Sequence, residues 1–144
     1  MSAPRFFFYG TLLAGSGNPV ARVAHRKLLP GRPATAPGAL HAIRDAAGWY
    51  PALTPGEGEV RGMVHEAARG FGTADLARLD AYEECGPGGE YQRREIAVRS
   101  GGQEVLAQAY VYVAALPEGA LPVPDGDFAA FLQRGGLSGY RPPD

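Results

Sequence analysis

Apolar residues occur along this chain in short runs and in two-residue alternation, and both patterns predict strands. Residues 5–9 form an unbroken apolar run, which predicts a fully buried first strand. Residues 91–99 and 105–113 predict a hairpin joined through Ser100-Gly101-Gly102. In its second arm one face would carry Val105, Ala107, Ala109, Val111 and Val113. The other face would carry Leu106, Gln108, Tyr110 and Tyr112.

Prolines and glycines break the pattern between these segments. Pro33, Pro37 and Gly38 interrupt residues 32–43, so we expect short strands or extended segments there, with 39–43 the best candidate. Residues 49–53 are apolar and extended, because the residue before a proline avoids the helical region. Residues 60–65 are a further strand candidate.

Three segments show helix signals. Asn18 as N-cap with Pro19 at the first position predicts a helix that runs to about Leu29. Thr73 can cap a helix over residues 74–84. Asp125 can cap a short helix that carries Phe128, Phe131 and Leu132 and ends at Gly135-Gly136. The tail, residues 138–144, should be loose unless Tyr140 docks.

These elements predict a mixed α/β or α+β domain. About six strands with two or three flanking helices would form a curled sheet or small β-barrel. At 144 residues the chain, residues 1–144, is expected to be a single domain with a proper core.

Composition narrows the classes of function. With 14 basic and 15 acidic residues, the net charge of −1 gives no sign of a nucleic-acid or membrane partner. A single cysteine, Cys85, excludes a disulfide within the chain and a cysteine-based metal site. The first apolar run is too short for a signal sequence or a membrane span, so we expect a cytoplasmic protein.

Glu83 is the candidate for acid–base chemistry. Leu76, Leu79 and Glu83 fall on one stripe of the helix expected after Thr73, and the stripe ends in a carboxylate. An inward carboxylate tends to have a raised pKa, which suits a general base near neutral pH. If the helix instead frays at Tyr82, Glu83 would be solvated.

The turn Tyr9-Gly10-Thr11-Leu12 is the second candidate. A buried strand that leads into a glycine turn lets backbone N–H groups approach a ligand. The alternative is an ordinary connection between a strand and a loop. It is neither a P-loop nor a dinucleotide-binding glycine motif.

Other polar residues are better read as structural. Asp80 is expected to bond backbone amides, and Glu84 to be a solvated neighbour. His25, His41 and His65 have no paired metal-ligand spacing, and Cys85 has no histidine partner motif. Of Tyr110 and Tyr112, one can line a pocket while the other packs in the core.

Taken together, these segments resemble the gamma-glutamylcyclotransferase-like superfamily in its AIG2-like branch, over about residues 5–113. Within it the resemblance is to the gamma-glutamylamine cyclotransferases. The motifs that carry it are Phe8-Tyr9-Gly10-Thr11-Leu12 followed by Gly15 and Asn18, Tyr50-Pro51-Ala52-Leu53, Gly58-Glu59-Val60-Arg61-Gly62-Met63-Val64, Leu79-Asp80-x-x-Glu83, Tyr91-x-Arg93 and Ala109-Tyr110-Val111-Tyr112.

The resemblance implies the reaction and the site. The α-amine of a γ-glutamyl amide would attack its own γ-carbonyl, releasing 5-oxoproline and a free amine. It implies Glu83 as the catalytic base. It implies a small-molecule substrate and no metal or other cofactor. The residues that it implies for substrate binding are Tyr9, Gly10, Thr11, Leu12, Tyr91 and Tyr110.

Two alternatives remain open at the level of the sequence. One is an enzyme that removes a γ-glutamyl group from a biosynthetic intermediate; the other is a non-catalytic binding or regulatory module of the same fold. The chain departs from the resemblance by having Glu84 and by placing Gly86-Pro87-Gly88-Gly89-Glu90 before Tyr91. That segment is expected to tune which leaving amine is accepted.

Overall fold

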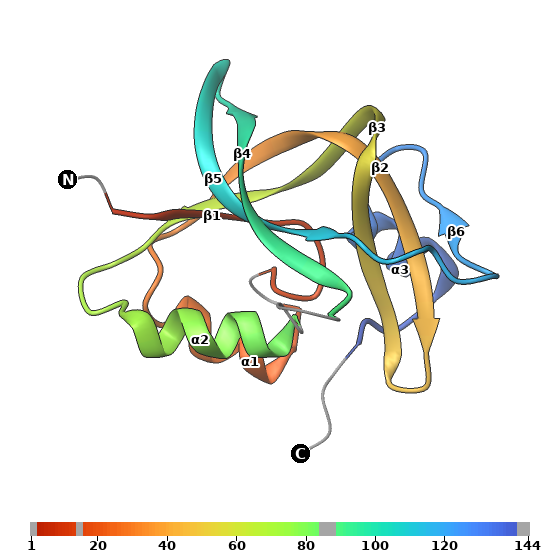
Figure 1. Ribbon diagram of the computed structural model, residues 1–144, viewed down its shortest axis with the longest axis horizontal. Coiled ribbons are helices and arrows are strands. Elements are labelled where there is room, and N and C mark those ends of the chain that lie inside the picture. Colours follow the sequence, from red (N-terminus) through yellow and green to blue (C-terminus); the bar gives the residue numbers. More distant parts are fainter. Residues whose placement is uncertain (1–2, 14–15, 84–88, 141–144) are drawn as a thin grey trace.

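The computed structural model describes residues 3–13, 16–83 and 89–140, and within them five strands close into a barrel (Figure 1). Around the barrel the order is β3-β1-β5-β4-β2, and pairing of β2 with β3 closes the ring. A short sixth strand pairs with β2. Only the β1–β5 pairing is parallel among these. The strands are β1 (Arg5–Phe8), β2 (Arg32–Asp45), β3 (Gly48–Glu66), β4 (Tyr91–Ser100), β5 (Gln103–Tyr112) and β6 (Leu121–Pro122). The predicted α+β fold with a small barrel is confirmed.

Strands β2 and β3 form one long hairpin where the sequence suggested shorter pieces. Their register shifts between Pro37 and Ala39, which marks a bulge. Gly38 lies there with φ +145°, a backbone conformation that other residues rarely adopt. The bulge absorbs the local break, so β2 continues through both prolines instead of ending at them.

The β4–β5 hairpin matches its prediction. Ser100 pairs with Gln103, and the turn residues Gly101 and Gly102 both have positive φ. Alternate residues of β5 enter two different core clusters: Ala107, Ala109 and Val111 one, Tyr110 and Tyr112 the other. Leu106, on the same strand, does not follow this pattern and is exposed.

The core has two layers set by the alternation in β1. Phe7 and Tyr9 pack with apolar residues from all five barrel strands, and Phe128 joins them. Phe6 and Phe8 point the other way and pack with residues of the first two helices. This unbroken apolar run is therefore buried on both faces, as predicted.

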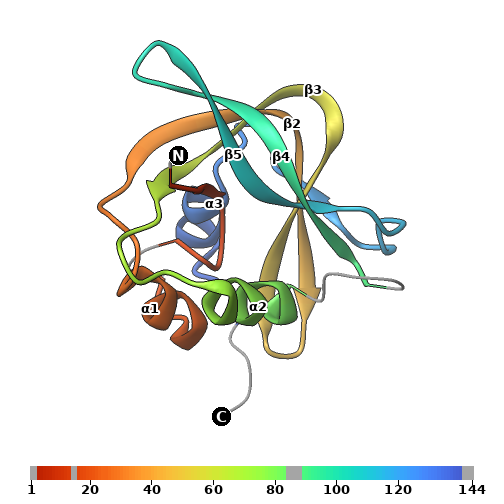
Figure 2. The same cartoon turned by 60° about the vertical axis from the view of Figure 1, so that its left-hand side comes forward.

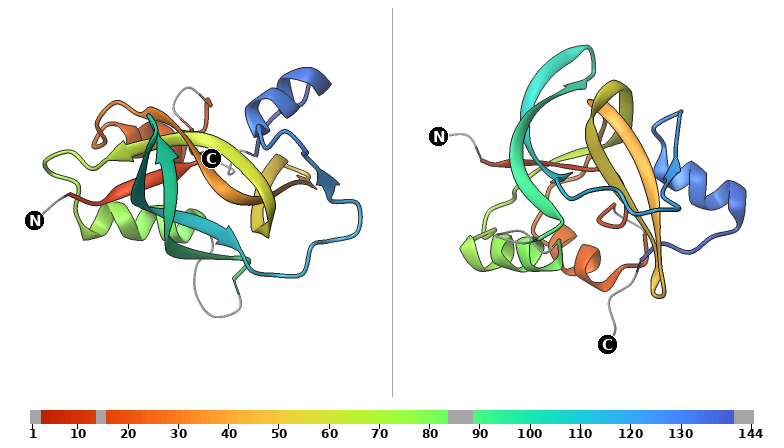
Figure 3. Two further views of the ribbon diagram at one scale, coloured as in Figure 1. Left: turned by 90° about the horizontal axis from the view of Figure 1, so that it is seen from above. Right: turned by 45° about the vertical axis from the view of Figure 1, so that its right-hand side comes forward.

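Helices α1 (Pro19–His25) and α2 (Thr73–Tyr82) lie side by side against the barrel, and α3 (Phe128–Gly135) lies apart from them, next to β3 (Figures 2 and 3). The N-cap Asn18 is as predicted, and its Oδ1 accepts from the N–H groups of Val20 and Ala21. The helix ends at His25, earlier than the predicted Leu29. The reason is that the N–H of Leu29 donates to the carbonyl of Glu66, which draws the chain out to the end of β3.

The other two caps differ from their predictions. The N-cap of α2 is Gly72, not Thr73, because the Asp75 carboxylate reaches back and accepts from the Gly72 N–H at 2.9 Å. The N-cap of α3 is Asp127, not Asp125, and its carboxylate accepts from the Ala130 N–H at 2.9 Å. Asp125 instead accepts from the Asp127 N–H.

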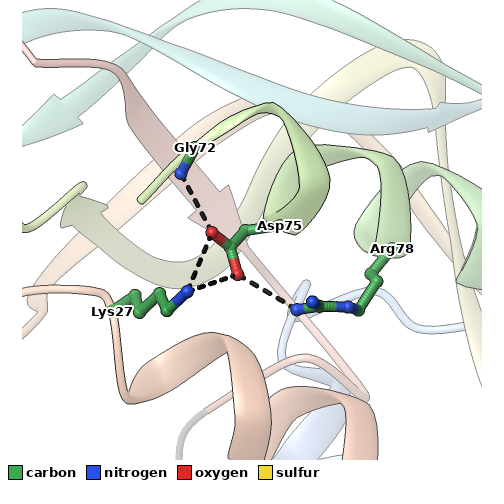
Figure 4. Close-up of polar contacts among 4 residues, drawn as sticks. All are labelled: Lys27, Gly72, Asp75 and Arg78. Atoms are coloured by element: carbon green, nitrogen blue, oxygen red, sulfur yellow. Dashed lines mark hydrogen bonds and ion pairs between the residues drawn. The ribbon is translucent and has the colours of Figure 1, made fainter. Parts of the chain in front are cut away.

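Asp75 also joins the two neighbouring helices (Figure 4). Its carboxylate accepts from Lys27, which follows α1, at 3.2–3.3 Å, and from Arg78 on its own helix at 3.1 Å. The bond from Gly72 and the two cations hold the pKa of Asp75 below its usual value. The start of α2 is thereby fixed, and the end of α2 carries Glu83.

No helix in the described part of the chain is long and apolar enough to cross a membrane.

Candidate active site

Glu83 is the C-cap of α2, immediately after the last helical residue. The helix does end at Tyr82, and Glu83 is half-buried. Leu79, one turn earlier on the same stripe, is 1% exposed and anchors this side of the helix in the core. Burial raises the pKa of Glu83 to about 8. The side chain lines two adjoining cavities.

The smaller cavity lies against the turn that follows β1. It measures about 20 Å³, room for about one water-sized group, and is lined by Phe7, Phe8, Tyr9, Gly10, Thr11, Leu12, Pro51, Glu83 and Tyr110. The turn is closed by a bond from the Leu13 N–H to the Gly10 carbonyl at 2.9 Å. In the part of the chain that the structure describes, the N–H groups of Gly10, Thr11 and Leu12 have no acceptor. Three backbone donors are therefore available beside one carboxyl group.

Gly10 is required here by space. A Cβ at this position would lie 2.2 Å from Cγ of Pro51 on β3. Since real Cβ atoms essentially never come closer than 3.0 Å, any other residue would move the turn or the strand. The close approach presses the turn against β3, which forms the opposite wall of both cavities.

The larger cavity measures about 150 Å³ and opens on the other side of Glu83. Its walls are aromatic and acidic. They consist of Thr11, Asp45, Tyr50, Pro51, Tyr82, Glu83, Glu90, Tyr91 and Tyr140.

The six residues expected to bind substrate all line one cavity or the other, around Glu83. Several of their polar groups are engaged in the fold. Tyr9 donates to the carbonyl of Tyr110 at 2.5 Å, and Tyr91 donates to the carbonyl of Pro51 at 2.5 Å. The hydroxyl of Tyr110 donates to Asp80 at 2.8 Å. These hydrogen bonds fix three of the residues that line the two cavities.

Asp80 has the expected structural role, but its partners in the described part of the chain are side chains, not backbone amides. Its Oδ1 accepts from Nε of Arg93 at 3.0 Å and from the Tyr110 hydroxyl. Arg93 also donates to Gln108 at 2.8 Å. The network ties α2 to β4 and β5 three residues before Glu83.

Sequence reasoning did not assign Tyr82 and Tyr140 to the site. Tyr82 Oη lies 2.7 Å from the Thr11 hydroxyl and accepts from Asn18 Nδ2 at 2.8 Å. The same Asn18 amide donates to the Tyr140 carbonyl at 3.1 Å, and the Tyr140 N–H donates to the Trp49 carbonyl at 2.6 Å. Tyr140 thus docks, which the sequence left as the alternative to a loose tail, and it lines the larger cavity. The sequence signal for these two residues was Asn18. Its side-chain oxygen is used in capping the helix, which leaves its Nδ2 group in need of a partner elsewhere.

The three histidines do not form a metal site. His25 and His65 lie with ring centroids 4.6 Å apart, a contact that their sequence spacing did not reveal. Each bonds a backbone carbonyl, His25 that of Leu12 and His65 that of Leu29. Burial lowers the pKa of His65. Among residues 3–13, 16–83 and 89–140, no group of three His, Cys, Asp or Glu side chains could hold a metal ion. Cys85 and Glu84 lie outside the described residues, as does most of the 84–90 segment.

Comparison with known families decides where the chain belongs. The family described as gamma-glutamyl cyclotransferase, AIG2-like, matches residues 6–130. The chain belongs to this AIG2-like family. The match extends beyond the 5–113 region of the resemblance and reaches the first turn of α3. No curated protein matches the chain.

Solved structures of low identity share the fold of this AIG2-like chain. An AIG2-like protein of Mus musculus is 22% identical with a TM-score of 0.71, covering 100% of this chain and 99% of its own. YkqA of Bacillus subtilis is 19% identical with a TM-score of 0.67; the match covers 94% of this chain but 43% of YkqA. An uncharacterized protein of Pyrococcus horikoshii is 20% identical with a TM-score of 0.59, covering 93% and 97%. These likenesses show the barrel and helices, and the site stands on its own geometry.

Proposed function

We propose that the chain is a gamma-glutamyl cyclotransferase that converts a γ-glutamyl amide into 5-oxoproline and a free amine. One observation carries the proposal: the half-buried carboxyl group of Glu83, whose pKa burial raises to about 8, lines a cavity together with three residues whose backbone N–H groups have no described acceptor. Membership of the AIG2-like family supports the same reaction class.

The reaction needs a folded substrate and a proton carrier. The α-nitrogen of the γ-glutamyl group forms a bond to its own γ-carbon, and the amide bond to the leaving nitrogen breaks. Glu83, as carboxylate, accepts a proton from the α-ammonium group and returns it to the leaving nitrogen. The ring nitrogen releases one further proton and the free amine takes one from solvent, so charge balances.

The two cavities divide the substrate between them. The small cavity at Gly10–Thr11–Leu12 suits a negatively charged oxygen, either the α-carboxylate or the oxyanion that develops on the γ-carbonyl. The larger cavity has room for the leaving amine. Holding the γ-glutamyl chain bent in one geometry contributes much of the rate, because the attack is intramolecular.

The test is a panel of γ-glutamyl amides, dipeptides and larger conjugates with purified protein, read by mass spectrometry of 5-oxoproline. Release of 5-oxoproline from at least one member, absent with Glu83→Gln, is expected. The pattern across the panel separates a general cyclotransferase from an enzyme that accepts only a large conjugate. Binding of γ-glutamyl compounds without any 5-oxoproline would overturn the proposal in favour of a non-catalytic module.

A further inference from the structure

His25 bonds the turn that lines the small cavity. It is the last residue of α1, and its Nε2 lies 2.7 Å from the carbonyl oxygen of Leu12. Because a carbonyl oxygen only accepts hydrogen bonds, this ring nitrogen must carry the hydrogen and donate it. His25 is not among the described residues that line the two cavities beside Glu83. Any effect of His25 on the site must therefore pass through the backbone of the turn.

The bond to His25 orients two peptide units of this turn. The N–H and C=O groups of a trans peptide point in opposite directions, and the described residues contain no cis peptide bond. His25 holds the Leu12 carbonyl. The N–H of the same peptide unit is that of Leu13, which points the opposite way and donates to the Gly10 carbonyl at 2.9 Å. That bond fixes the next peptide unit, so the Thr11 N–H is directed away from Leu13.

The peptide unit between these two is held in the same manner. The Ser16 hydroxyl donates to the Thr11 carbonyl at 2.9 Å, so the Leu12 N–H of that unit points the opposite way. Two of the N–H groups that have no described acceptor, those of Thr11 and Leu12, are thus oriented by bonds to the carbonyls of the turn. Donors that are oriented before the substrate arrives need no reorganisation when charge develops in the reaction.

The ring of His25 is packed in this position. It stands edge-on to Phe8, with ring centroids 5.6 Å apart at 72°, and to His65, with centroids 4.6 Å apart at 65°. His65 is 4% exposed, and its Nδ1 donates to the Leu29 carbonyl at 2.8 Å. A Cβ on Gly31 would lie 2.6 Å from the His65 ring, so the backbone there packs closely against it. The two imidazole rings therefore link β3 to the turn.

We propose that His25 is a positioning residue for the cyclotransferase, which orients the backbone donors of the turn through the Leu12 carbonyl. The inference rests on the proposed function, in which these donors hold the α-carboxylate or the oxyanion of the substrate. His25 itself does not touch the substrate. Ser16 has the same task at the neighbouring carbonyl. Without these bonds the peptide units can rotate, and the donors then spend part of the time turned away from the cavity.

The experiment compares two substitutions of His25 by activity and by binding. His25→Phe keeps a ring and removes the N–H, whereas His25→Gln keeps an N–H near the position of Nε2. His25→Phe should lower kcat/KM with the best substrate of the panel about tenfold or more, the size expected for a hydrogen bond to a charged group. It should also weaken the binding of 5-oxoproline, measured by calorimetry, about tenfold. His25→Gln should restore most of both.

His41→Phe is the matched control. His41 is also half-buried, but it lies on β2 and is not among the described residues that line the two cavities. Its kcat/KM and its affinity for 5-oxoproline should equal those of wild type. Thermal melting verifies that each variant is folded.

Nuclear magnetic resonance tests the contact in wild-type protein, so it does not depend on the folding of a variant. With the rings neutral, His25 should be the Nε2–H tautomer and His65 the Nδ1–H tautomer. Addition of 5-oxoproline should shift the amide signals of Thr11 and Leu12, and Ser16→Ala should reduce the shift at Leu12 more than that at Thr11. A neutral His25 in the Nδ1–H tautomer would overturn the positioning role.

Binding separates this inference from the proposed function. Binding of 5-oxoproline that depends on His25, with no 5-oxoproline released from any γ-glutamyl compound, would overturn the cyclotransferase and keep the positioning role at an anion-binding turn. Turnover and 5-oxoproline affinity unchanged in His25→Phe would overturn the positioning role and keep the cyclotransferase. Equal losses in His25→Phe and His25→Gln would also overturn it, because the packing of the ring and not its hydrogen bond would then account for the effect.

Discussion

The hydroxyl of Tyr9 donates to the carbonyl of Tyr110 at 2.5 Å, across 101 positions of sequence. The same oxygen accepts from the Leu53 N–H at 3.3 Å. One buried phenol thereby joins the end of β1 to β5 and β3, directly beside the turn that lines the small cavity.

Tyr9→Phe should therefore lower the free energy of unfolding. It leaves a buried N–H and a buried carbonyl without this partner, a loss of about 1–3 kcal/mol. Denaturant unfolding measures it. Tyr112→Phe is the comparison, because its hydroxyl bonds the half-buried Glu90 and a carbonyl at 3.4 Å, and it should cost less. Equal losses of unfolding free energy would show that the hydrogen bonds of Tyr9 stabilise the fold no more than those of Tyr112.

Glu83→Gln should remove turnover and leave the fold intact. Glutamine keeps the size and the acceptor oxygen but cannot carry a proton, so kcat should fall about 10²–10⁴-fold. The measurement is 5-oxoproline release under saturating substrate, with Glu95→Gln as a charge-matched control that keeps wild-type rates. Retention of more than about a tenth of the activity would remove Glu83 from the role of base.

Activity should rise with pH on its acidic side. The base must be ionised in the free enzyme, and burial raises the pKa of Glu83 to about 8. The profile of kcat/KM should therefore show an inflection near 8 and lie well below its plateau at pH 6. An inflection near the ordinary value of 4.5 would mean that the carboxyl group is solvated in solution.

The stability of the fold, in contrast to the activity, should fall as pH rises. A folded-state pKa above the unfolded value means that the native protein binds the proton more tightly. The stabilising contribution of Glu83 is then complete below about pH 4.5 and is lost as pH rises through about 8. The melting temperature of wild type should fall relative to that of Glu83→Gln between these values. His65 adds an opposite trend below its usual range, because burial lowers its pKa, but this is common to both proteins.

Gly10→Ala should damage the site through packing alone. Its Cβ would overlap Pro51, so the turn must shift and both stability and kcat/KM should drop. Gly72→Ala is the matched control: its Cβ would lie in open space at φ −128°, so its only expected cost is the poorer fit of alanine at a helix N-cap, and it should lose less stability than Gly10→Ala and keep its activity. A Gly10→Ala protein with unchanged melting temperature and activity would show that the turn and Pro51 can move apart without affecting the fold or the site.

Features that depend on neighbouring residues could be predicted from the sequence, whereas features that depend on contacts between distant residues could not. The strands of the β4–β5 hairpin follow from local periodicity, whereas the spacing of Leu76, Leu79 and Glu83 left open whether the carboxyl group of Glu83 would be solvated. The bulge at Gly38 was not predicted, because it depends on pairing with β3. The true caps of α2 and α3 depend on which of several nearby carboxylates faces the helix end. The roles of Tyr82 and Tyr140 depend on contacts across 64 and 122 positions, which no local pattern encodes.

The docking of Tyr140 has a consequence for how the protein is made. Strands β1 to β5 are all synthesised by Tyr112, so the barrel can close while the segment that leads to Tyr140 is still being translated. The amide of Asn18 can bond Tyr140 only afterwards, since loop closure over 122 residues waits for the second partner to emerge. A nascent chain halted before that residue would have the barrel but an unfinished cavity. The ability to hold a leaving group would thus arise only after the barrel itself is in place.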